Sequence, residues 1–204
     1  MDLTPDEIDD VLYLTRVDER DELLAFINEL AQKYSTTSAA VLESSIDPES
    51  HNNAIHFCAA NGLTALLQAL LQVLHDAHQP SPLINSRNES GNAPLHWAAL
   101  NGHLETAKLL IAAGADIWAR NMAGNLAIFE AERAGKDDVV AYLLEVGGTE
   151  KEQAGGSAGT QNDSVGPEQD GEDVPMGNGH AEEVNEAFGS GEVTERLQES
   201  TLDE

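Results

Sequence analysis

One segment decides the fold of this chain: Gly91-Asn92-Ala93-Pro94-Leu95-His96-Trp97-Ala98-Ala99-Leu100-Asn101-Gly102-His103. The stretch Ile55-His56-Phe57-Cys58-Ala59-Ala60-Asn61-Gly62 lies 40 residues before Leu95–Gly102 and follows the same order. Glycines recur at intervals of 33 residues, in the pairs Gly91 and Gly124, Gly102 and Gly135, and Gly114 and Gly147. A fixed period of this length indicates an array of stacked repeats, each too small to bury its apolar face alone.

The repeated segment resembles the ankyrin pattern Thr-Pro-Leu-His-x-Ala, which residues 93–98 match at every fixed position but the first. This resemblance implies an all-α ankyrin solenoid of about four repeats, followed by a tail. Residues 51–148 hold the repeats, in which His56 and His96 are expected to bridge backbone groups of adjacent units. Stacks of this kind are binding scaffolds, so the pattern points away from catalysis.

Residues 1–50 predict a degenerate N-terminal capping repeat and a linker. Thr4-Pro5-Asp6-Glu7 is typical of a helix start, with Thr4 as the cap and Glu7 completing a capping box. Apolar residues then predict one helix over 8–17 and a second over 23–30, with Glu19 at the position of the turn glycine. The outer face of such a cap can be polar because no neighbour covers it.

The second repeat is seven residues longer than the period of 33. Leucines and valines continue at helical spacing from Leu66 to Leu74, so we place the extra residues mainly in its second helix. That helix is expected to be lengthened by about two turns, roughly 10 Å.

The tail, residues 149–204, is expected to be mostly disordered. It holds fifteen Asp and Glu against Lys151 and Arg196, and Phe188 is its single aromatic residue. The whole chain carries 37 acidic and 10 basic residues, for a formal net charge of −27. Such a charge repels nucleic acid and anionic membranes and steers basic partners toward the protein, although solubility alone would also explain it.

No pattern for catalysis, a cofactor or a metal is found. His75 and His78 stand three apart near Cys58, but structural zinc needs four converging ligands at a recognisable spacing. Paired acids such as Asp9 and Asp10 diverge on a helix, which favours solvated faces over catalytic dyads. The lone Cys58 and the lack of a signal-like start or membrane-length apolar run predict a protein of the cytoplasm and nucleus, monomeric on its own.

The candidate site is the concave surface of the stack, where finger tips and first helices contact partners. By register it includes residues of all three regular units: Glu49, Glu89, Asn92, Leu100, Asn101, Arg120, Met122, Asn125 and Arg133. Trp118 stands at a polar position of the pattern and is expected to be an exposed anchor, whereas Trp97 is expected in the core.

Residues 91–102, 117–121 and 127–132 with Gly135-Lys136, followed by an acidic tail, resemble the fungal Yar-type ankyrin proteins. Members of this family are dedicated chaperones of newly made small-subunit ribosomal protein three. Our hypothesis for such a client is that its basic N-terminal segment lies in the groove against Trp118, Leu100 and Met122. Its cations would meet four carboxylates, those of Asp18, Glu49, Glu89 and Glu130.

A second interpretation remains open. A generic regulatory ankyrin adaptor, masking a transcription factor or a kinase, would use the same groove and would not require a basic partner.

Overall fold

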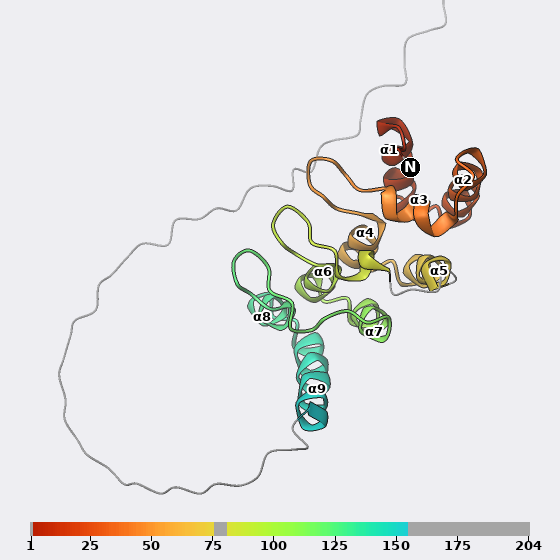
Figure 1. Cartoon of the computed structure of the whole chain (residues 1–204). Helices are drawn as coiled ribbons and strands as arrows, with labels where there is room; N and C mark the ends of the chain where they lie inside the picture. Colours follow the sequence, from red (N-terminus) through yellow and green to blue (C-terminus); the bar gives the residue numbers. More distant parts are fainter. Residues whose placement is uncertain (1, 76–80, 155–204) are drawn as a thin grey trace, which may run out of the picture. The chain divides into compact units, whose positions relative to one another are not determined.

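The computed structural model describes residues 2–75 and 81–154, so the disorder predicted for the tail concerns residues almost entirely outside the described part. Helices pair into hairpins that stack in two layers (Figure 1). The first layer contains α1 (Pro5–Arg16), α4 (Ala54–Asn61), α6 (Pro94–Asn101) and α8 (Ala127–Arg133). The second contains α2 (Arg20–Lys33), α3 (Ser38–Ser44), α5 (Thr64–His75), α7 (Leu104–Ala112) and α9 (Asp137–Ala154). The predicted all-α solenoid is confirmed.

The core runs between the two layers. Leucine and isoleucine side chains such as Ile55, Leu67 and Leu95 are almost fully buried there, and small residues such as Ala59 and Ala99 let neighbouring helices approach closely. Cys58 is fully buried in α4, and burial raises the pKa of its thiol. In the described part of the chain, no helix is long and apolar enough to span a membrane.

The capping box at the N-terminus forms as predicted. Thr4 accepts a hydrogen bond from the Glu7 amide at 3.3 Å, and the Glu7 carboxylate accepts one from the Thr4 amide at 2.8 Å. The same carboxylate also accepts from Lys33 Nζ at 2.6 Å and Tyr34 OH at 2.8 Å. The bonds from Lys33 and Thr4 lower the pKa of Glu7 to about 2, so this carboxylate fastens the start of α1 to the end of α2.

Three local expectations for residues 1–50 are corrected. Asp18, with φ 60°, takes the left-handed turn position predicted for Glu19, because a short Asp side chain tolerates that conformation better than Glu. Val17 lies just after α1, not within it, and is exposed. The predicted linker contains α3, whose Ala39, Val41 and Leu42 are buried in the core.

The second helix of the second repeat is lengthened as predicted. Up to His75, α5 has 12 residues against 9 in α7. The remaining extra residues fall in 76–80, outside the described residues, so the predicted two turns are tested only up to His75. A short 3-10 helix, η1 (Pro82–Asn85), then leads into the third repeat.

The last helix runs past residue 148, the end of the repeats predicted from the sequence. α9 continues through Gly147 and Gly148 to Ala154. The residues after Gly148 include Glu150, Lys151, Glu152 and Gln153, which are good helix formers, and no following repeat requires the chain to reverse here.

Candidate partner-binding surface

Three short hairpins precede α4, α6 and α8 and project from the first layer (Figure 1). Each is closed by a backbone hydrogen bond: from Asp47 N to Asn52 O at 2.8 Å, from Asn88 N to Asn92 O at 3.0 Å, and from Asn121 N to Asn125 O at 3.0 Å. We call residues 47–52, 88–92 and 121–125 the fingers. The Asp or Asn that opens each finger also accepts bonds from amides inside it through its side chain, which fixes the turn.

The fingers bind to one another in series. The Glu89 amide donates to Ser50 O at 2.9 Å, and the Met122 amide donates to Ser90 O at 3.1 Å. Side-chain bonds repeat the link, from Asn88 to Asn52 at 3.1 Å and from Asn121 to Asn92 at 2.9 Å. The three fingers therefore form one hydrogen-bonded rib, and their exposed side chains are held at fixed spacing.

Two buried histidines connect this rib to the first layer, as predicted. Nδ1 of His56 accepts from the Asn53 amide, and Nε2 donates to Asn92 O of the next finger at 3.0 Å. His96 makes the equivalent bonds to Ala93 and to Asn125 O at 3.1 Å. Burial lowers the pKa of His56 to about 4 and also lowers that of His96, so both rings stay neutral at pH 7.

Glu130 has a different place from the one predicted. Its residue is 5% exposed, and its carboxylate accepts bonds from Asn121 and Asn125, each at 3.0 Å, and from Arg133 at 2.6 Å. Burial opposes ionisation, but these bonds outweigh it and the pKa is lowered. Glu130 therefore anchors the third finger to α8, and its carboxylate is buried rather than exposed on the surface.

Trp118 is exposed as predicted, with 53% of its surface accessible. A Cβ atom at Gly147 would lie 3.4 Å from Cη2 of Trp118, so the indole lies against α9 in the second layer. Trp97 is half-buried and packs against the core, as predicted.

The other residues predicted to contact a partner fall into two groups: side chains exposed on the surface, and side chains hydrogen-bonded within the protein. Glu49 and Glu89 are exposed on the first two fingers, Met122 is 79% exposed on the third, and Asp18 is exposed in the turn between α1 and α2. Leu100 is half-buried at the end of α6.

Four of the predicted residues use their polar groups inside the protein: Asn92 accepts from Asn121, Asn101 donates to Ala60 O, Asn125 donates to Glu130, and Arg120 donates to Gly124 O. Arg133 is engaged by Glu130.

The register of the repeats did not identify Phe57 as a candidate partner-binding residue. It occupies in α4 the position of Trp97 in α6, and the Arg16 guanidinium lies 5.2 Å from its ring centroid. The equal spacing of Phe57 and Trp97 from their histidines is the signal that could have identified it.

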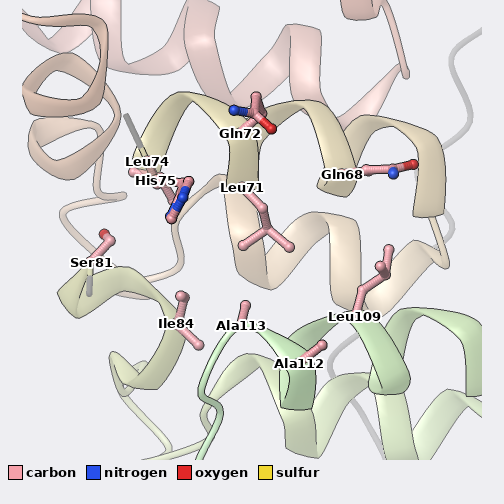
Figure 2. A pocket seen from close by; sticks show the side chains of 10 residues that line it. All are labelled: Gln68, Leu71, Gln72, Leu74, His75, Ser81, Ile84, Leu109, Ala112 and Ala113. Carbon is pink, nitrogen blue, oxygen red and sulfur yellow. The ribbon is translucent and has the colours of Figure 1, made fainter. Parts of the chain in front are cut away.

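A cavity of about 580 Å³ lies in the second layer, between α5, η1 and α7 (Figure 2). Figure 2 shows Leu71 pointing into it from α5 toward Leu109 and Ala112 on α7. The described residues that line it include His75 and Ser81 but no carboxylate. Nor do the described residues contain a group of three or more His, Cys, Asp or Glu side chains that could hold a metal ion. His78 of the candidate histidine pair lies outside the described part.

A stack of helical hairpins joined by a rib of fingers is the architecture of a repeat scaffold that binds other proteins. The chain belongs to the ankyrin repeat family, whose three-copy model matches residues 27–121 and 55–154.

Within the ankyrin repeat family, the chain is similar in sequence to several known proteins. The chain is 32% identical over 111 residues to the ankyrin repeat-containing protein YAR1 of Saccharomyces cerevisiae, covering 52% of this chain and 56% of YAR1. It is 37% identical over 83 residues to the human Notch-regulated ankyrin repeat-containing protein, covering 41% and 70%. The match thus spans about half the length of YAR1.

A solved structure, that of the yeast ribosomal protein Rps3 in complex with its chaperone Yar1, matches with a TM-score of 0.63 and 33% identity. This match covers 71% of the chain and 95% of the solved chain. The resemblance to Yar-type ankyrin proteins is confirmed.

Proposed function

We propose that this protein is a non-catalytic chaperone that shields the basic N-terminal segment of newly made small-subunit ribosomal protein three. One observation carries the proposal: the chain resembles a structure of Rps3 with its chaperone Yar1 over 95% of the solved chain. In this proposal the protein is a monomer on its own and is found in the cytoplasm and the nucleus.

The charge of the chain supports a basic client. A free ribosomal protein exposes cationic segments that normally contact RNA and that associate with stray anions before assembly. The net charge of −27 raises the rate at which such a segment is captured. Ribosomal RNA, which is far more highly charged, then competes for the same cations and releases the client.

The fingers supply the contacts. Glu49 and Glu89 face solvent on neighbouring fingers that a hydrogen bond fixes side by side, so two cations of one client segment meet them in register. Met122 and Leu100 provide the apolar part of the surface, and Asp18 extends the acidic edge toward α1. Trp118 and Glu130 are left out of this surface because they pack against α9 and under the third finger.

The test measures the affinity for purified ribosomal protein three as a function of salt. Reversal of both finger charges, Glu49→Lys with Glu89→Lys, is expected to weaken binding about tenfold or more and to flatten the salt dependence. The matched control reverses two exposed carboxylates of α8 and α9, Glu132→Lys with Glu145→Lys, and is expected to change the affinity by less than about threefold. A flat salt response of the unmodified protein contradicts the proposal.

A regulatory adaptor remains the alternative outcome. If the full-length protein fails to bind ribosomal protein three and instead binds a neutral or acidic partner through the fingers, the adaptor interpretation replaces the chaperone.

A further inference from the structure

A groove of about 420 Å³ lies between α1 and α2. Its floor is formed by Tyr13, Leu14 and Phe26, and carboxylates line it on both helices, from Asp10 on α1 and from Glu22 and Glu29 on α2. Tyr13 is 58% exposed. The groove is separate from the fingers, which precede α4, α6 and α8.

The position of this groove makes its apolar floor unexpected. The opposite sides of α1 and α2 carry the buried residues Val11, Leu12, Leu23 and Ile27, so the groove faces outward at the N-terminal end of the stack. A terminal repeat needs a polar outer face to stay soluble. Aromatic and aliphatic side chains grouped on such a face, within a polar rim, are suited to contact with another protein.

No described residue forms an ion pair with the carboxylates of the rim, those of Asp10, Glu22 and Glu29. The cations of these two helices are engaged elsewhere: Arg16 lies over the Phe57 ring, Lys33 binds Glu7, and Arg20 pairs with Asp21. The groove therefore combines an apolar floor with uncompensated negative charge on both walls.

We propose that this groove is a second docking site, which binds a cationic amphipathic helix of the client. A third helix lying between two others places apolar residues at i, i+3 or i+4 and i+7 onto the floor, and its flanking Lys and Arg meet the carboxylates. The inference rests on the proposed function only for the identity of the partner.

Charge argues against the other occupants. The tail of this chain holds fifteen acidic residues against two basic ones, so the rim repels it. A second copy bound through the same groove would bring the two acidic rims together. A basic polypeptide is the partner whose charge the groove complements.

The test uses the full chain and a synthetic helical peptide with leucines on one face and lysines on the other. In NMR titrations of the isotope-labelled protein, the peptide is expected to shift the amide signals around Tyr13 and Phe26. Tyr13→Ala is expected to weaken binding of the peptide about tenfold, and because Tyr13 is more than half exposed, this variant should keep its fold.

A second variant tests the rim without touching the floor. Glu22→Gln with Glu29→Gln is expected to weaken binding about fivefold, mostly at low salt. The control, Glu132→Gln with Glu145→Gln, removes the same charge from α8 and α9 and is expected to leave the affinity within about twofold.

The inference is overturned by peptide-induced shifts confined to the fingers, by equal losses of affinity in the two glutamine pairs, or by equal binding of a peptide with glutamates in place of the lysines. The proposed function fails separately. If the peptide binds between α1 and α2 while ribosomal protein three is not bound at all, the groove stands and the client is wrong. If the client binds and the groove shows no shift, only the second site is lost.

Discussion

At the scale of single residues, the surface of this protein depends on polar groups that are buried beneath it. His56, His96 and Glu130 carry no exposed function, yet each holds a finger to the first layer through bonds to backbone or side-chain atoms. Histidine is suited to this place because one ring nitrogen accepts from its own repeat while the other donates to the next. Because these rings must stay neutral, the stability of the protein depends on pH.

We expect the protein to lose stability between pH 7 and pH 5. The pKa of His56 falls from its ordinary 6.5 to about 4 in the folded protein, so the unfolded chain binds a proton that the folded chain excludes. His56 alone accounts for about 2 kcal/mol of the free energy of unfolding lost over this interval. His96 adds to the loss in the same direction.

Urea denaturation at both pH values measures this effect. Because general charge effects also change with pH, wild type is compared with His56→Gln, whose stability should fall less between pH 7 and pH 5. Equal pH slopes for the two proteins would show that His56 binds a proton equally well in the folded and unfolded states, so that folding does not lower its pKa.

At the scale of elements, the hairpin turns decide how closely the repeats stack. Gly62 ends α4 with φ 68°, and a Cβ placed there would lie 2.5 Å from Nδ1 of His103 in the next hairpin. His103 Nε2 in turn bonds Ala60 O at 3.1 Å, so the ring fills the space above this turn. Gly124 has a similar φ of 79° in the third finger, but no atom lies within 4 Å of its Cβ position.

Gly62→Ala is expected to destabilise the protein more than Gly124→Ala. Both substitutions place a side chain at positive φ, which costs about 1 kcal/mol. Only Gly62→Ala also displaces the His103 ring, which adds about 1–2 kcal/mol by breaking its bond and its packing. Thermal unfolding of the two variants side by side measures the difference, and equal midpoints would mean that His103 moves away at no cost.

The sequence predicts the helices that obey the repeat pattern, but it misses the features that depend on tertiary contacts. The glycine spacing and Leu95-His96 place α4 to α8, because period and turn chemistry are local signals. α3 is missed since its seven residues are flanked by Ser and Thr, and only burial of Val41 and Leu42 reveals why it forms. The burial of Glu130 and the packing of Trp118 on Gly147 each join separate segments, so neither is visible in a single stretch of sequence.

At the scale of the whole molecule, a rigid stack is combined with an acidic tail. The described residues up to Ala154 include α1 to α9 and the complete rib of fingers, whereas residues 155–204 contribute 13 of the 37 acidic residues. Fold and much of the charge are therefore separable. This division allows the contribution of the tail to be measured without disturbing the repeats.

Removal of residues 155–204 is expected to leave the unfolding midpoint and the helical content per repeat unchanged. The truncated protein should bind an N-terminal peptide of ribosomal protein three with nearly the same affinity, because the finger carboxylates remain. It should suppress aggregation of the whole client less well, since diffuse contacts with the tail are lost. Light scattering of the client with each protein compares the two, and equal suppression would remove the tail from the mechanism.

Cys58 offers a way to observe the stack opening. It is the single cysteine of the chain, its side chain is sealed in α4, and its raised pKa keeps it a thiol. A maleimide can reach the sulfur only when the second repeat transiently detaches from its neighbours. The labelling rate of the native protein therefore measures how often this opening occurs. A bound client that spans the fingers would lower the rate of Cys58 labelling without contacting the sulfur.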